Sequence, residues 1–453
     1  MSMYEKIPKV CIRFAASCIV SGIFLLTVCQ GSVRASTQKT PPEVDLGRKV
    51  YAQIRPHLSF TKNPLIRHEL EGIGKRIVGN LPVNPYEFTF FPIISGDVNA
   101  FALPNGYIFV TNRLIQTCDT ADELAFVLCH ETAHVMRGHF MNFISQQAKV
   151  DLSTLALIVL GALIARDSDL QAGIPALSLG LNQNLALSYS RIQEYEADSY
   201  GLRYLAQSGF NSEGAPRFME KLRVLSQITI SPPVYLSTHP MPVDRLINIK
   251  KRAEACPSCP SRSMERFSRL KLWCRVETEL ADRLLAEFTP LSMDNPNDVD
   301  VIYSLALIHE KLGSSKDAEG YYKKGLTLSP RDEDLLRDYA IFLYRRDRIE
   351  DAESFLKQAV AIKPDDPLAQ HYLGRTLMDH QRIDEAIEAF LESVRICPEF
   401  PESHNFLGIL YNKKGDEEKS HHHFARYFSL LGNEEAAQAH SKKTVSPSTD
   451  EGG

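Results

Sequence analysis

Apolar positions in the first third of the chain follow two different periods. Residues 43–79 alternate apolar and charged side chains at helical spacing, with breaks at Pro56 and Pro64, which predicts two helices. Residues 86–94 are rich in aromatic and β-branched side chains, which favour a strand. The pattern therefore changes from helix to sheet near residue 86.

A hairpin is predicted after this strand. Two short apolar runs, Asn99–Leu103 and Tyr107–Thr111, flank Pro104-Asn105-Gly106, and an Asn-Gly pair can supply the positive φ angles of a tight turn. We expect a small antiparallel sheet. The hairpin either packs as an ordinary core element or offers an edge strand that holds an extended peptide by main-chain hydrogen bonds.

An apolar helix carries the chemistry of this region. The spacing of Thr120-Ala121-Asp122-Glu123 is that of a capping box, which predicts a helix beginning there and running through residues 124–140. His130 and His134 are four positions apart, about 40° around the helix axis, so their imidazoles converge on one metal ion. His139 is turned about 140° from His134 and is not an expected ligand.

Glu131 follows the first histidine and completes the H-E-x-x-H arrangement of zinc peptidases. It lies beside the histidine pair, where its carboxylate can take a proton from a water molecule at the metal. The alternative is a coincidental histidine pair on an amphipathic helix.

Two weakly polar stretches follow this helix. Leu152–Ala165 contains no charged residue in its fourteen positions, which is shorter than the roughly 20 that span a bilayer. Together with Ile174–Leu187 it predicts a buried helical hairpin. Shallow membrane contact or a cover over the metal site are the alternatives.

A catalytic zinc ion needs a third protein ligand and an open position for water. Residues 190–198 place Glu194 and Asp198 on one helix face, whereas Glu196 is turned away. One of the first two carboxylates can bind zinc while the other accepts a hydrogen bond from a ligand histidine. A solvated acidic face is the alternative.

These motifs together resemble the HtpX-like and Ste24-like gluzincin peptidases. The resemblance rests on HETAH at 130–134 and on SRIQEYEADSYG beginning at Ser190, while VNAFALPNGYIFVTNRLI and STHPMPVDRL look like the periplasmic, BepA-like branch. It covers about residues 40–255. It implies an α+β zincin-like domain, mostly helical with a small antiparallel sheet.

Carried over position by position, the resemblance assigns the site residues. It implies one Zn²⁺ per chain bound by His130, His134 and Glu194. Glu131 would be the general base, and Asp198 a supporting carboxylate.

Two further positions remain open. His239 would be an extra ligand in a resting state, a hydrogen-bond donor to the oxyanion of the tetrahedral intermediate, or simply a turn residue before Pro240. Asn105 stands where many relatives have glycine, which concerns the shape of the turn and not the chemistry.

The C-terminal part of the chain is repetitive. Proline recurs every 34 residues, the period of tetratricopeptide repeats, at Pro296, Pro330, Pro364 and Pro398. Small residues recur where the two helices of a unit meet, at Ala306, Ala340, Gly374 and Gly408. In the second helix alanine recurs at Ala318, Ala352 and Ala386, and large residues recur at Tyr322, Leu356, Phe390 and Phe424. We expect an all-α solenoid of four units with a concave face for another polypeptide, or a plain spacer. His421–His423 predict a solvated helix face rather than a metal site.

The predicted organisation has five parts. They are an export signal (1–35), a zinc metallopeptidase domain (36–255), a linker with a degenerate helical pair (256–298), the repeats (299–432) and a disordered tail (433–453). An uncleaved anchor or lipid attachment at Cys29 are alternatives for the first part. In an oxidising compartment Cys256 and Cys259, with Cys274 nearby, favour a linker disulfide.

We therefore expect a periplasmic zinc endopeptidase that acts on misfolded or misassembled envelope proteins. Its repeats would dock substrates or, by the resemblance, outer-membrane assembly machinery, and peripheral membrane contact is a further possibility. The net charge of −5 and the lack of a long basic run argue against nucleic acid as a partner. The rivals are a chaperone with a latent peptidase site and a purely structural zinc site.

Overall fold

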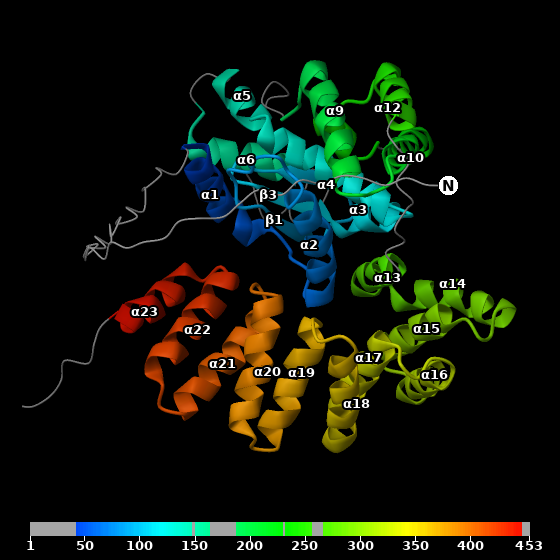
Figure 1. Ribbon diagram of the computed structural model, residues 1–453, viewed down its shortest axis with the longest axis vertical. Helices are drawn as coiled ribbons and strands as arrows, with labels where there is room; N and C mark the ends of the chain where they lie inside the picture. The colour runs from blue at the N-terminus through cyan, green and yellow to red at the C-terminus, as the bar shows by residue number, and fades with distance from the viewer. Residues whose placement is uncertain (1–41, 147–149, 164–186, 230–231, 256–265, 446–453) are drawn as a thin grey trace, which may run out of the picture. The chain divides into compact units, whose positions relative to one another are not determined.

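The computed structural model describes residues 42–146, 150–163, 187–229, 232–255 and 266–445 (Figure 1). The expected export signal, most of the second apolar stretch and the Cys256/Cys259 pair lie outside the described residues. Within the described ranges no helix combines the length and the hydropathy needed to cross a bilayer.

The first helices end and begin at prolines, as predicted. Helix α1 (Pro42–Ile54) passes into the short 3₁₀ helix η1 (Arg55–His57), and α2 (Pro64–Val78) follows. The Asn63 side chain accepts a hydrogen bond from the Leu65 N–H at 3.0 Å, and Pro64 occupies the first helical position. Proline suits that position because its missing N–H would have no partner there.

The sheet has three strands in the order β1-β3-β2: β1 (Thr89–Ile93), β3 (Tyr107–Thr111) and β2 (Ala100–Ala102). The β2–β3 hairpin is antiparallel as predicted, with Gly106 at φ 90° in its turn. The expectation of a wholly antiparallel sheet is wrong, because β1 pairs with β3 in parallel. After β1 the chain crosses to the far edge of the sheet, where it forms β2. It then turns back and forms β3 between the other two strands, so β3 runs in the same direction as β1.

Helix α4 (Ala121–Met136) is buried along nearly its whole length, which explains why both of its faces are apolar. The Thr120 side chain caps it by accepting the Glu123 N–H at 3.3 Å. The capping box is only half formed, because the Glu123 carboxylate accepts the N–H of Asp119 instead. The helix ends before Gly138, which has φ 64°, so His139 lies on a new helix, α5 (His139–Gln146).

Helix α9 (Arg191–Gln207) packs closely against α4 because Gly201 has no side chain. A Cβ atom on Gly201 would lie 3.3 Å from the backbone of His130. Ser190 begins α9 with a complete capping box to Gln193. The cap fixes the first turn of α9, which carries Glu194, relative to α4.

Helix α6 (Leu152–Leu163) is buried against α1 and the sheet. Its end is tied to the sheet by the Asn99 side chain, whose Nδ2 donates to the Ala162 carbonyl at 2.7 Å. The first helix of the predicted buried hairpin is therefore confirmed as a core element.

The remaining helices before the repeats are α3 (Asn112–Thr117), α10 (Gly214–Ile228), α11 (Tyr235–Thr238), α12 (Val243–Ala255), α13 (Phe267–Thr278) and α14 (Ala281–Asp294). Helix α13 packs against α2 and α3, and its Trp273 and Cys274 belong to the same hydrophobic cluster as α4. Cys274 is a buried free thiol, so it takes no part in a disulfide. Two helices, α13 and α14, lie in the segment expected to hold a helical pair, and α13 contributes residues to the core.

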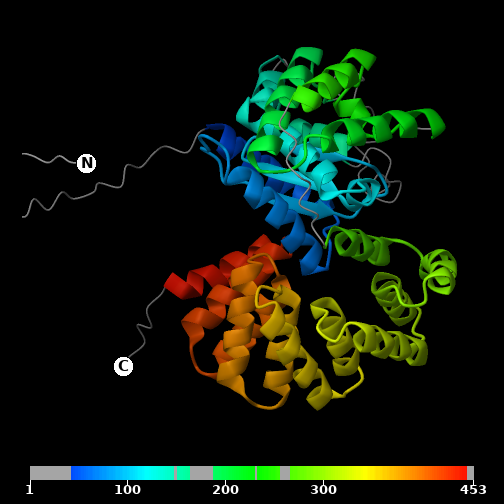
Figure 2. The same ribbon diagram turned by 45° about the vertical axis from the view of Figure 1, so that its right-hand side comes forward.

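The repeats form four antiparallel helix pairs (Figures 1 and 2): α15 (Val299–Lys311), α16 (Ser315–Leu328), α17 (Glu333–Tyr344), α18 (Ile349–Ile362), α19 (Pro367–Asp379), α20 (Ile383–Ile396), α21 (Pro401–Lys413) and α22 (Glu417–Leu430). A Cβ on Gly374 would lie 3.0 Å from the Phe390 ring, and one on Gly408 would lie 2.8 Å from Phe424. These contacts confirm the predicted pairing of small and large positions.

The end of the array differs from the prediction in two ways. First, residues of the expected disordered tail form α23 (Glu434–Val445). The His440 ring of this helix packs on Phe428, and its Nδ1 lies 2.9 Å from His421 Nδ1.

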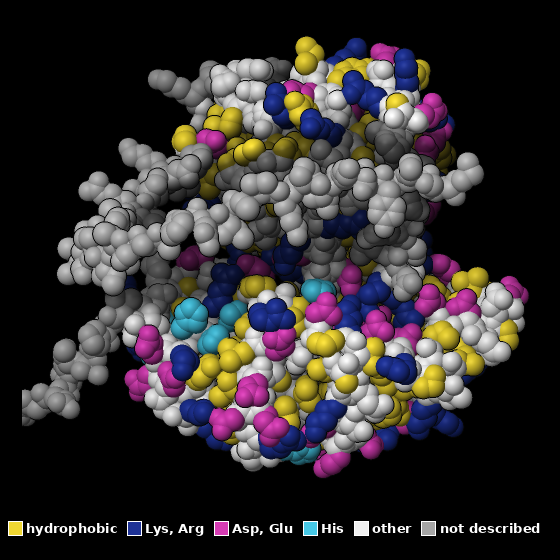
Figure 3. Space-filling model, viewed as in Figure 1, with side chains coloured by type: hydrophobic (Ala, Val, Ile, Leu, Met, Phe, Trp, Pro, Cys, Tyr) yellow, Lys and Arg dark blue, Asp and Glu magenta, His cyan; other side chains and the backbone are white. Residues whose placement is uncertain are grey.

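The second difference concerns the histidine run, whose side chains gather on the surface over α22 (Figure 3). His423 is not solvated, because it is buried and its Nδ1 lies 3.0 Å from His404 Nδ1. The polar composition of residues 433–453 and of the histidine run gave no sign of these ring contacts between helices.

Buried His371 on α19 makes the stability of the repeats dependent on pH. Burial lowers the pKa of His371 to about 3, and its Nδ1 lies 2.8 Å from the Ser403 hydroxyl. Because the unfolded chain takes up this proton below about pH 6.5 and the folded chain does not, unfolding becomes easier as pH falls towards 3. We expect a loss on the order of 2 kcal/mol between pH 7 and 5. Urea unfolding of His371→Gln at both pH values should show a smaller loss; an unchanged difference would contradict this assignment.

Candidate metal centre

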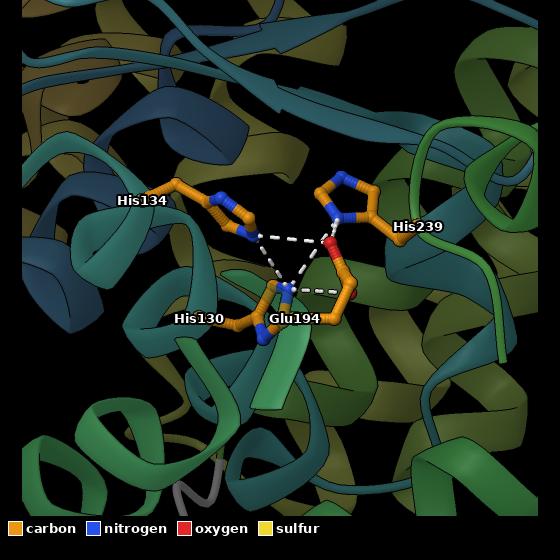
Figure 4. A group of neighbouring side chains, drawn as sticks. All are labelled: His130, His134, Glu194 and His239. Carbon is orange, nitrogen blue, oxygen red and sulfur yellow. Dashed lines mark hydrogen bonds and ion pairs between the residues drawn. The ribbon is translucent and has the colours of Figure 1, made fainter. Parts of the chain in front are cut away.

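Four buried side chains meet at one point inside the first domain (Figure 4). They are His130 and His134 on α4, Glu194 on α9 and His239 after α11, and one donor atom from each lies within 4.8 Å of the others. His130 Nε2 lies 3.0 Å from His134 Nε2. Glu194 Oε1 is 3.4 Å from His134 Nε2 and 2.9 Å from His239 Nδ1. The structure thus brings together the residues predicted to bind the metal.

The four side chains are arranged to bind a metal ion rather than to form a hydrogen-bond network among themselves. His130 Nε2 faces His134 Nε2 at 3.0 Å, His239 Nδ1 at 3.4 Å and Glu194 Oε2 at 3.5 Å. A single ring nitrogen carries at most one proton, so it cannot donate to all three neighbours. Imidazole nitrogens with one carboxylate are a donor set typical of zinc sites, and one cation among them would serve every contact.

Asp198 supports the cluster from behind, on the side predicted for it. Its Oδ1 lies 3.1 Å from His130 Nδ1, and it receives two hydrogen bonds from the Arg245 guanidinium at 2.6 and 2.8 Å. Arg245 also forms an ion pair with Glu194. Burial alone would raise the pKa values of these two carboxyl groups, but Arg245 and the neighbouring histidines hold both below their usual range.

The sequence analysis did not identify Arg245 as a residue of the site, although it has one of the largest fully buried side chains among the described residues. Its one sequence signal is its place in VDRL, shortly after His239. A lone arginine in such a stretch predicts a surface position, since arginine is seldom buried without a partner.

His139 touches the cluster without joining it. Its Nδ1 lies 2.9 Å from His134 Nδ1, and its Nε2 lies 3.2 Å from Glu196 Oε2. The prediction that His139 is not among the metal donors agrees with this placement. The helix break at Gly138 turns His139 back towards α4. A helix that continued to residue 140 would have pointed His139 away from His134, so the sequence analysis did not predict this contact.

Glu131 lies on the cluster side of α4 and is fully buried. Its Oε1 is 3.5 Å from His239 Nε2. Burial raises the pKa of Glu131, which makes its carboxylate a better proton acceptor than an exposed glutamate. Its position beside the donor atoms, outside the set of four, suits a group that moves a proton.

Two tyrosines enclose the cluster. Tyr235 stacks on His239 with ring centroids 4.4 Å apart, and Tyr189 stacks on His134 at 4.1 Å. A cavity of about 240 Å³ connects His134 and Tyr189 to Ala102–Pro104 at the end of β2. A larger cavity of about 920 Å³ lies among α3, α10 and α12, and none of the four cluster residues lines it.

Comparison with known proteins gives two family matches. Residues 64–253 match the model of peptidase family M48, and residues 302–444 match the middle TPR-like domain of cilia and flagella-associated protein 70.

Individual relatives match about half of this chain. A beta-barrel assembly-enhancing protease of Escherichia coli is 30% identical over 241 residues, which are 52% of this chain and 49% of that protein. The mitochondrial metalloendopeptidase OMA1 of Danio rerio is 31% identical over 216 residues, 45% of this chain and 44% of the relative. The chain therefore spans about half the length of the curated relatives it matches. The crystal structure of MamA covers 34% of this chain and 95% of its own, at 20% identity and a TM-score of 0.31.

Proposed function

We propose that this protein is a zinc-dependent endopeptidase, because residues 64–253 match the model of peptidase family M48 and tetratricopeptide-like repeats follow them. The observation that carries the proposal is the buried His130/His134/Glu194 cluster with Glu131 beside it. In this assignment those three side chains hold the metal. Asp198 fixes His130 through its other ring nitrogen, as supporting carboxylates do in zinc sites.

Zinc, when bound, would polarise the scissile carbonyl and make a water molecule acidic enough to give up a proton near neutral pH. Glu131 takes that proton, because its carboxylate is buried beside the donor atoms and its pKa is raised. The same carboxyl group then gives the proton to the leaving nitrogen. Arg245 keeps Glu194 and Asp198 charged and oriented during both steps.

The substrate backbone is proposed to lie along β2. The Leu103 N–H donates to Tyr107 O and the Thr111 N–H to Asn99 O, so in this antiparallel pair Ala100 and Ala102 are non-hydrogen-bonded positions. Their N–H and C=O groups point away from β3, and in the described parts of the chain no strand pairs with that side of β2. An extended peptide can therefore add to this edge beside the cluster.

The substrate class is proposed to be polypeptides of the cell envelope that have misfolded or failed to assemble. The support is the similarity to beta-barrel assembly-enhancing proteases, together with the export signal expected at residues 1–35. The repeats would then bind a client or an outer-membrane assembly complex through their concave face.

Hydrolysis of casein by the purified full-length chain tests the endopeptidase proposal. Cleavage should stop when a chelator removes the metal and return when zinc is restored. A chaperone with a vestigial site would bind unfolded protein with no cleavage under any of the three conditions. A structural site would unfold the first domain once the metal is removed, which circular dichroism would detect.

His239 is proposed to be a fourth ligand in a resting state, because its Nδ1 lies among the other donor atoms. A fourth protein ligand closes a tetrahedral site, whereas catalysis needs an open position. His239→Ala should therefore raise the initial rate of casein hydrolysis severalfold at unchanged zinc content. A lower rate at full zinc content would contradict this role and favour His239 as a donor to the oxyanion.

A further inference from the structure

Tyr189 carries a buried polar group that the mechanism above leaves unused. The residue is 3% exposed, and its hydroxyl has no hydrogen-bond partner among the described residues. A buried hydroxyl without a partner loses the hydrogen bonds that water would make to it, which destabilises the folded chain. Such a group next to a candidate metal centre suggests a partner that arrives with the substrate.

The phenol is held rigidly over the cluster. Its ring stacks on His134 at 4.1 Å and lies 5.3 Å from the His239 ring. The Tyr189 N–H donates to the Thr238 carbonyl at 3.0 Å, and the next residue, Ser190, caps α9. Both neighbouring segments also supply a residue of the cluster, so the ring cannot move independently of the donor atoms.

Tyr189 also borders the place where a substrate would lie. Tyr189 lines the cavity of about 240 Å³ that runs from His134 to the end of β2. A tyrosine phenol ordinarily titrates near pH 10, so the hydroxyl keeps its proton and is a hydrogen-bond donor at neutral pH.

We propose that the Tyr189 hydroxyl donates a hydrogen bond to the scissile carbonyl oxygen as that oxygen becomes negatively charged. The inference rests on the proposed peptidase function and adds a catalytic residue to it. The water oxygen bonds to the carbonyl carbon, its proton passes to Glu131, and the π electrons move to the oxygen that Tyr189 stabilises. On collapse the carbonyl re-forms, the C–N bond breaks, and Glu131 protonates the leaving nitrogen.

Two other roles for Tyr189 are less consistent with its surroundings. A ring that merely packs on His134 needs no hydroxyl, and phenylalanine would avoid the cost of burying one. A phenolate ligand in a resting state is less consistent because four other side chains already supply the clustered donor atoms. His239 is the other candidate donor to the oxyanion, but its Nδ1 faces Glu194 and His130, and its Nε2 lies 3.5 Å from Glu131 Oε1.

Tyr189→Phe tests the proposal, because it removes the hydroxyl and keeps the stacked ring. Two inhibitors are built on one peptide that the wild type cleaves: a phosphinic analogue, which mimics the tetrahedral oxyanion, and a reduced amide, which has no such oxygen. We expect kcat to fall about a hundredfold with KM and zinc content unchanged. The phosphinic analogue should bind more weakly by a similar factor, and the affinity for the reduced amide should not change.

Tyr204→Phe is the matched control, since Tyr204 is a buried tyrosine on α9 that has no ring contact with the cluster. It should behave as the wild type in every assay. Equal loss of affinity for both inhibitors, or no loss for either, in Tyr189→Phe would overturn the role of the hydroxyl while leaving the peptidase assignment intact. A wild-type chain that neither cleaves the peptide nor binds either inhibitor would overturn both.

Discussion

Glu131→Gln should lower peptide hydrolysis by roughly 10²–10⁴-fold while client binding and zinc content stay at the wild-type level. Glutamine has nearly the same size as glutamate, so the fully buried position can accommodate it without a cavity. It cannot accept a proton from water, and general-base catalysis contributes roughly 10²–10⁴-fold to such reactions. The loss should appear in kcat, because Glu131 is not one of the four residues whose donor atoms cluster.

The measurement pairs casein hydrolysis with binding of an unfolded client to the full-length variant. Thr132→Ser is a suitable control, because Thr132 is the next residue on α4 and is also fully buried. If the main activity were that of a chaperone, Glu131→Gln would protect and bind clients just as the wild type does, with no cleavage by either protein. Retained hydrolysis in Glu131→Gln would remove Glu131 from the mechanism.

Arg245→Met should have the largest effect on stability, about 3–5 kcal/mol lost from the free energy of unfolding. Arg245 is 1% exposed and is bound to both Glu194 and Asp198, which are themselves buried. Methionine fills much of the same space but leaves two buried carboxylates without their cation. Each then has to lose its charge or remain unpaired in a poorly solvated site.

Urea unfolding with and without zinc measures this effect. Arg223→Met is the matched control, because Arg223 forms an ion pair with Glu220 that is exposed to solvent, and such pairs contribute little. Zinc should restore part of the stability of Arg245→Met, since a metal ion bound by Glu194 replaces some of the missing positive charge. A loss no larger than that of Arg223→Met would show that Arg245 does not stabilise the two carboxylates.

The site could be predicted from sequence wherever the helix period alone decides the geometry. His130 and His134 are four residues apart on one helix, and Glu194 and Asp198 repeat the same spacing on another. Their meeting also depends on Gly201, which lets the two helices approach. Spacing along the chain carried no information about that contact, and the family resemblance supplied the pairing instead.

The residues that sequence reasoning missed act across long separations. Arg245 reaches Asp198 from another helix, and Tyr189 packs on His134 from a segment without regular structure. Neither stands in a periodic pattern, so nothing local distinguishes it from a surface residue. His139 is placed by the break in the helix at Gly138, a position that depends on where α4 ends.

The fold shows the same division between local and distant causes. The 34-residue period predicted four helix pairs, because each unit repeats the same small-against-large contact, as at Gly374 and Phe390. The parallel pairing of β1 with β3 depends on how the chain crosses the sheet. Helix α23 is stabilised by ring contacts with α22, such as that of His440 with Phe428, which polar composition does not reveal.

Zinc K-edge absorption spectroscopy of the purified full-length chain tests the ligand set most directly, with Glu194→Gln as the comparison. If the proposed zinc site is correct, we expect one zinc ion per chain with only nitrogen and oxygen neighbours, including imidazole scattering, and a marked loss of zinc affinity in Glu194→Gln. Sulfur neighbours at the zinc ion, or an unchanged spectrum and affinity in Glu194→Gln, would contradict a metal held by His130, His134 and Glu194.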